Sequence, residues 1–235
     1  IQAILVSPGF LFLVENQPPL STPGGRHRIS DIDFASRMSL FLWSSLPDEE
    51  LLKIAEDNEL RRPDILQAQL KRMLLDPKAE ALTQNFAGQW LYLRNLEFHR
   101  PDVMAYPDFD VRLRAAMYRE SALFFSEIIR QDASVLEFID ADYSFLNARL
   151  ARHYGLDNVQ GTEFRRVIFE PEVNRGGLLG QASLLTVTSY GNHTSVVKRG
   201  QWILDHLLAA PPPPAPPDVP ALVAEEGGKA LNARE

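Results

Sequence analysis

The prolines of this chain decide where helices can run. Seven of the 17 prolines fall within the ten positions 211–220, and the proline ring and its missing amide hydrogen exclude a helix there. We therefore expect a proline-rich arm in the polyproline II conformation, with a mobile tail, over residues 210–235. Earlier prolines instead stand in the first turn of predicted helices, where proline is tolerated: Pro47, Pro63 and Pro77.

Between the prolines, apolar residues recur at helical spacing. The clearest stripe belongs to a predicted helix over 108–130, with Leu113, Met117, Phe124 and Ile128 on its core face. Ser30 followed by Asp33 resembles a capping box, and Asp142 is a plausible N-cap for a helix over 143–153, after which Gly155 fits the C′ position. The β-branched and aromatic run 163–169 predicts a short strand.

The predicted fold class is therefore mainly α. We expect a bundle-like domain of several helices, then a smaller helical module with a short β element, and then the polyproline arm. The predicted parts are the end of a preceding module at 1–15, a Pro/Gly/Ser-rich linker at 16–29, the helical domain at 30–157, the smaller module at 158–209 and the arm and tail at 210–235.

Composition excludes several classes of function. The chain has no cysteine, so it holds no disulfide, thiol nucleophile, thiolate metal site or covalently attached haem. With 24 basic and 31 acidic residues its formal net charge is −7, which argues against nonspecific nucleic-acid binding. No apolar run is long enough for a membrane span. We predict no metal site, because the histidines lack partners at ligand spacing.

Several long strings resemble one protein family. They are ASRMSLFLWSSLPDEELL, NFAGQWLYLRNL, DADYSFLNARLARHYGL and the block RGGLLGQASLLTVTSYGNHTSVVKRGQWILDHLLAAPPPPAPPDVPAL. Together they are similar to the large secreted, cytochrome-c-like multidomain proteins of planctomycetes and acidobacteria, whose tandem modules are domains of unknown function. One departure is the sequence His193-Thr194-Ser195-Val196-Val197, where the family commonly has Arg-Thr-Ser-Pro-Val.

The resemblance implies an exported protein, periplasmic or secreted, that is linked to electron transfer. In this family a Cys-x-x-Cys-His haem-attachment motif follows the proline arm. We therefore expect this chain to be a fragment that lacks that motif, with haem c in the adjoining region. The implied partners are neighbouring modules of the same longer chain, and the arm either spaces these modules or offers a Pro-x-x-Pro surface to a protein partner.

The candidate cofactor-binding residues are His193, Lys198 and Arg199, in a polar loop and the first turn of the helix that follows it. Unpaired amides of that turn and basic side chains suit an anion such as a haem propionate. The alternative for Arg199 is a pair with an internal acid that fixes the loop. His193 is either an axial ligand or a simple hydrogen-bonding residue.

Other polar residues are interpreted as structural. We expect the acid pairs Asp31/Asp33, Asp108/Asp110 and Asp140/Asp142 to cap helices rather than to bind a cation. Glu120 lies on the apolar stripe and needs a partner, for which Arg94, Arg149 and Arg175 are candidates. His153 is predicted to be a cation at a helix end. The tryptophans, Trp43, Trp90 and Trp202, are predicted to pack in the core.

Three functions follow from these observations. The first is a non-haem scaffold portion that positions or shields a neighbouring haem module. The second is a structural interaction module that assembles into a larger complex without redox chemistry. The third is a stand-alone enzyme, which requires the acids and His193 to converge in one pocket. The catalytic residues, the substrate and the oligomeric state do not follow from the sequence.

Overall fold

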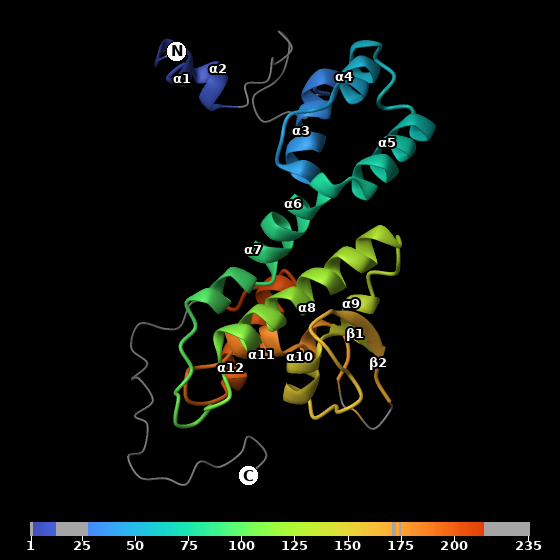
Figure 1. Ribbon diagram of the computed structural model, residues 1–235. Helices are drawn as coiled ribbons and strands as arrows, with labels where there is room; N and C mark the ends of the chain where they lie inside the picture. Colours follow the sequence, from blue (N-terminus) through green and yellow to red (C-terminus); the bar gives the residue numbers. More distant parts are fainter. Residues whose placement is uncertain (1, 13–27, 171–172, 174, 214–235) are drawn as a thin grey trace. The chain divides into compact units, whose positions relative to one another are not determined.

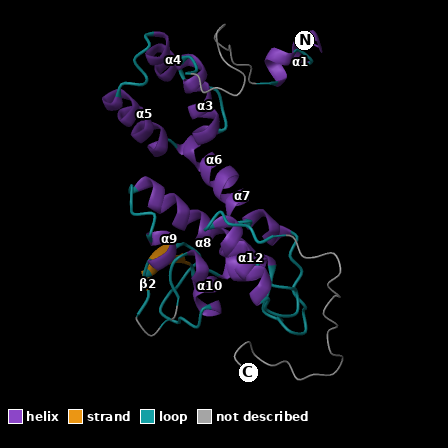
Figure 2. Ribbon diagram, turned by 180° about the vertical axis from the view of Figure 1, so that it is seen from behind, coloured by secondary structure: helices purple, strands orange, loops and turns teal. Residues whose placement is uncertain are grey.

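A computed structural model describes residues 2–12, 28–170, 173 and 175–213 (Figure 1). Helices dominate these residues, and the only strands among them form one short pair (Figure 2), so the predicted fold class is confirmed. The linker up to residue 27, with His27, and the arm and tail from residue 214 lie outside the described residues. No helix in the described ranges has the length and apolar character that crossing a membrane requires.

The chain divides into two compact units, Ile1–Leu82 and Thr83–Glu235. The domain limits drawn from the sequence stay a prediction. The first unit contains α1 (Gln2–Leu5), α2 (Pro8–Leu11), α3 (Asp31–Trp43), α4 (Glu49–Glu56), α5 (Pro63–Leu75), the 3-10 turn η1 (Pro77–Ala79) and α6 (Glu80–Leu82).

Helix starts in the first unit follow their capping residues. The Ser30 hydroxyl accepts a hydrogen bond from the Asp33 amide at 3.0 Å and donates one to the Asp33 carboxylate at 2.6 Å, which confirms the predicted cap. Asp48 accepts from the Leu51 amide at 3.0 Å, so α4 begins after Asp48 and not at Pro47 as predicted. The buried Trp43 indole donates to the Met73 carbonyl at 2.9 Å and ties α3 to α5.

The second unit is built around one long helix, α8 (Val111–Arg130), which Asp110 caps. Its predicted core face is buried and packs against β1, α10 and α11. The elements of this unit are the π-helical turn η2 (Thr83–Ala87), α7 (Gly88–Trp90), η3 (Leu93–Glu97), α8, α9 (Glu137–Asp140), β1 (Tyr143–Leu146), α10 (Ala148–His153), β2 (Arg165–Ile168), η4 (Leu178–Gly180), α11 (Ala182–Val187) and α12 (Val196–His206).

The predicted helix over 143–153 is wrong in its first half. Tyr143–Leu146 is a strand that pairs antiparallel with β2, with Tyr143 opposite Ile168. The predicted strand near 163–169 is thus confirmed, and its pairing draws the aromatic segment 143–146 into extended backbone. Asn147, not Asp142, caps α10 by accepting from the Leu150 amide at 3.0 Å. Gly155 follows that helix with a φ of +75°, as predicted for a C′ residue.

Residues beyond 158 complete the core that α8 and α10 begin. Val159, Phe169 and Ala182 are buried in one cluster with Leu150 and other residues of α8 and α10. At the end of the unit, the Trp90 indole donates to the His206 carbonyl at 2.9 Å and joins α7 to α12. The second unit therefore depends on residues from nearly its whole described length.

Gly177 allows the closest backbone approach in this unit. Its φ is +51°, and a Cβ atom there would lie 2.3 Å from the Ile139 carbonyl oxygen. The Gly177 amide donates to the Ala141 carbonyl at 3.1 Å. The segment that begins at Arg175 thus lies directly against the α9 backbone.

Candidate functional site: a cavity between two loops

Two loops of the second unit meet through their backbones. The Asp102 amide, in the loop before α8, donates to the Gly191 carbonyl at 2.8 Å, in the loop between α11 and α12. A Cβ atom at Gly191 would lie 2.5 Å from the Arg100 carbonyl oxygen. The approach of the two loops therefore requires glycine at this position.

The substitution Gly191→Ala should separate the two loops, because real Cβ atoms do not come this close to a carbonyl oxygen. We expect faster hydrogen exchange at the Asp102 amide and a loss of stability of about 2 kcal/mol. Gly200→Ala is the control, since a Cβ atom there has open space inside α12 and alanine favours a helix. Equal exchange rates at Asp102 in wild type and Gly191→Ala would contradict the expected separation.

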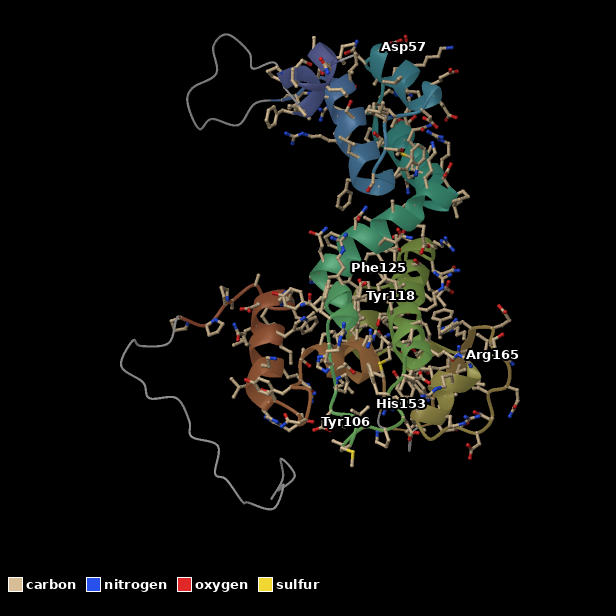
Figure 3. All side chains as sticks on the ribbon, turned by 60° about the vertical axis from the view of Figure 1, so that its left-hand side comes forward. Asp57, Tyr106, Tyr118, Phe125, His153 and Arg165 are labelled. Carbon is tan, nitrogen blue, oxygen red and sulfur yellow. The ribbon has the colours of Figure 1, made fainter. Side chains whose placement is uncertain are left out.

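A cavity of about 280 Å³ lies between these loops and the end of α10. The first loop contributes His99 and Tyr106, the second contributes Tyr190, α10 contributes His153 and α12 contributes Arg199. Tyr106 and His153 can be followed at the same end of this unit in Figure 3. The cavity therefore combines imidazoles, phenols and one guanidinium from four separate segments.

Arg199 is the one predicted site residue that lines this cavity. The half-buried guanidinium donates to the Thr188 hydroxyl at 3.3 Å, the Ser189 hydroxyl at 3.4 Å and the Leu185 carbonyl at 3.4 Å. Within the described ranges no carboxylate pairs with it, and the alternative of an internal acid partner stays a prediction. The three hydrogen bonds use Nε and Nη2 of the guanidinium, so its Nη1 group keeps donor capacity for an anion.

Lys198 and His193 lie beside the cavity and contact its wall. The Lys198 ammonium lies 4.2 Å from the centre of the Tyr190 ring, and the His193 ring centre lies 4.8 Å from it. Both residues are exposed, and the Nδ1 atom of His193 is 2.7 Å from the Asn192 side-chain oxygen. The structure thus places Lys198 and His193 against Tyr190, while Arg199 lines the same cavity as Tyr190, and their role as a cofactor contact stays a prediction.

The two histidines of the cavity were not predicted as site residues. Burial lowers the pKa of His99, and the charges of Lys198 and Arg114 lower it further. The residue His153 is exposed as a whole, but partial burial of its ring lowers its pKa, and Arg175 and Arg149 act in the same direction. Both imidazoles are therefore mainly neutral at pH 7, which corrects the prediction of a cationic His153.

Glu120 is the one fully buried carboxyl group described in the second unit. It accepts hydrogen bonds from the Ser144 hydroxyl at 2.7 Å and the Tyr154 hydroxyl at 2.6 Å. The predicted salt bridge is wrong, because two hydroxyl groups from β1 and the end of α10 take the place of an arginine. Burial raises the pKa of Glu120 to about 7, although both hydrogen bonds and the charge of Arg175 oppose the rise.

The predicted acid pairs do not converge on the cavity. Asp110 caps α8 by accepting from the Leu113 amide at 2.6 Å, and Asp31 forms an ion pair with Arg61 at 2.7 Å. In the part of the chain that the structure describes, no three histidine, aspartate or glutamate side chains are placed to hold a metal ion. Trp43 and Trp202 are buried, as predicted, and Trp90 is half-buried.

Comparison with protein-family models gives two matches. Residues 29–156 match PSD4, described as a protein of unknown function (DUF1592). Residues 175–235 match PSCyt3, also described as a protein of unknown function (DUF1588). Neither the curated proteins nor the solved structures gave a match to the chain. Because the PSD4 match covers more than half of the residues, this chain belongs to the PSD4 family of proteins of unknown function (DUF1592).

Proposed function

We propose that this chain is the non-haem scaffold portion of an exported, c-type-cytochrome-like protein that takes part in electron transfer, and that the cavity edge docks a neighbouring haem module. The observation that carries the proposal is Arg199, a guanidinium that lines a cavity and has no carboxylate partner in the described residues. The names of the two matching families, PSD4 and PSCyt3, support a cytochrome-like context. A periplasmic or secreted location belongs to the same proposal.

The size of the cavity limits which part of a haem group fits. At about 280 Å³ it is smaller than the sites that enclose a drug-sized ligand, which begin at about 300 Å³. Arg199, with Lys198 beside it, suits a propionate carboxylate at the edge of the macrocycle. The haem would supply the electron-transfer chemistry, and its attachment would lie in the neighbouring module, because this chain has no cysteine.

An interaction module without redox chemistry is the alternative. It is favoured by exposed apolar side chains on the loop before α8 and at the start of α12: Val103, Met104, Val196 and Val197. A stand-alone enzyme has less support, because His193 lies outside the cavity and the predicted acids act as caps and ion-pair partners elsewhere.

The proposal is tested with a haem c peptide that carries two free propionates, titrated into the chain and followed by its Soret absorbance. Arg199→Gln should weaken binding about tenfold, because it removes a charge-assisted pair. The matched control is Arg152→Gln, which changes an exposed arginine of α10 that does not line the cavity. Esterification of the propionates should weaken peptide binding to the wild-type chain. The loss should be at least as large as the loss that Arg199→Gln causes with the free peptide.

Two outcomes would overturn the propionate contact. One is the absence of peptide binding at millimolar concentration, and the other is equal binding of the free and esterified peptides. Haem staining and intact mass of the protein from its native source address the wider proposal, since a holoprotein without haem would contradict it.

A further inference from the structure

A second cavity lies in the same unit, beside Arg175, and shares the lining residue Leu185 with the first cavity. The Arg175 guanidinium lies over the Tyr154 ring, with its central carbon 3.9 Å from the ring centre. One of its nitrogens donates to the Gly180 carbonyl at 2.9 Å. The side chain is half-buried, and no carboxylate in the described residues forms an ion pair with it. Among the residues that the structure describes, its charge therefore has no counter-ion in direct contact.

The Tyr154 ring beneath this guanidinium is held by hydrogen bonds of its hydroxyl group. The Tyr154 hydroxyl donates to Glu120 at 2.6 Å and accepts from the Ala182 amide at 2.7 Å, so the buried ring is fixed at its far end. Glu120 does not reach Arg175 as an ion-pair partner, and near neutral pH its carboxyl is partly protonated because burial raises its pKa to about 7. The guanidinium is thus held in place by the ring and the Gly180 carbonyl, with no ion pair to a carboxylate in the described ranges.

The cavity beside Arg175 has a volume of about 570 Å³, and Leu156, Leu179 and Leu185 form part of its lining. Gly155 also lines it, and a Cβ atom at this glycine would meet nothing within 4 Å. The volume falls in the range of small-molecule sites, which combine an apolar lining with a few placed polar groups. One guanidinium beside three leucine side chains suits a ligand that has one negative charge and an apolar chain.

We propose that this cavity binds a small carboxylate with a short aliphatic chain, its carboxylate on Arg175 and its chain on the three leucines. A guanidinium offers parallel N–H donors that match the two oxygens of a carboxylate. A phosphate dianion suits the site less well, because Arg175 is its only lining cation among the described residues and the remaining lining gains nothing from contact with a charged group.

The test uses hexanoate as the probe, with hexanol and inorganic phosphate as comparators, and binding is measured by calorimetry on the full chain. Hexanoate should bind with a dissociation constant of about 1 mM, as its few heavy atoms allow. Arg175→Gln should weaken it about tenfold. Arg166→Gln is the matched control, because Arg166 lies over the Tyr143 ring at 3.8 Å and does not line the cavity.

Circular dichroism on each variant establishes that it is folded before binding is compared. If Arg175→Gln does not fold, Leu179→Asp is the second variant. It should abolish hexanoate binding, because it places a negative charge where the aliphatic chain of hexanoate would lie. Equal affinities for hexanoate and hexanol, tighter binding of phosphate than of hexanoate, or an unchanged affinity in Arg175→Gln would each overturn the proposed site.

Discussion

Replacement of Glu120 by glutamine should stabilise the second unit by about 3 kcal/mol at pH 8 and leave its stability nearly unchanged at pH 4. Burial raises the pKa of this carboxyl from 4.5 to about 7, so between these values the folded chain binds a proton that the unfolded chain has released. The wild-type contribution is fully present below pH 4.5 and is lost as the pH rises to 7. Glutamine resembles the protonated carboxyl and does not titrate.

The measurement is the free energy of unfolding in urea, at pH 4 and at pH 8, for wild type and Glu120→Gln. Hydrogen exchange of the α8 amides is then measured on the same two proteins. Glu127→Gln is the matched control, because Glu127 lies on the same helix and is partly exposed. The difference between the effects at pH 4 and pH 8 should be larger for Glu120→Gln than for the control. A Glu120→Gln effect that is equally large at pH 4 and pH 8 would show that the buried carboxyl keeps the same charge in the folded and unfolded states.

Gly177→Ala should destabilise the second unit by about 3 kcal/mol. One part of this loss is backbone strain, since Gly177 has a φ of +51° and a ψ of −171°, a conformation that costs residues other than glycine about 1–3 kcal/mol. The other part is steric, because the new Cβ atom would lie 2.3 Å from the Ile139 carbonyl oxygen. Neither the backbone at Gly177 nor that of α9 can move without disturbing the packing between them.

The control for this prediction separates the two parts. Gly155 has a φ of +75° but open space around the position of a Cβ atom, so Gly155→Ala should lose only about 1 kcal/mol. Chemical unfolding of both variants under one set of conditions gives the comparison. Equal losses would mean that the contact with Ile139 relaxes freely and adds nothing to the requirement for glycine at this position.

The helices were predictable because their signals are local. The apolar stripe of α8 and the caps Ser30 and Asp110 lie within a few residues of the turns they specify. The strand Tyr143–Leu146 was not predictable from local signals, because its extended conformation depends on pairing with residues 165–168, which follow an intervening helix. Short aromatic segments leave helix and strand open until such a partner is known.

The candidate site was predictable in part for the same reason. Arg199 was found from its place in the first turn of a helix beside a polar loop. His99 and His153 join it only through the fold, because they are 54 positions apart and no spacing rule connects them. The partners of Glu120 were not predicted correctly. The sequence shows that a carboxyl group on an apolar stripe needs a hydrogen-bonding partner, but it does not show that two hydroxyl groups fill that role.

The hydrogen bond between Trp90 and His206 spans 116 positions, and this separation determines when the second unit can be completed on the ribosome. At about 5–20 residues per second, α12 leaves the ribosome roughly 6–23 s after α7. During that interval the aromatic surface around Trp90, which includes contacts with Phe86, Phe125 and Phe138, waits for its last helix. A chaperone that binds nascent chains should therefore crosslink to Trp90 until α12 has emerged, and release it afterwards.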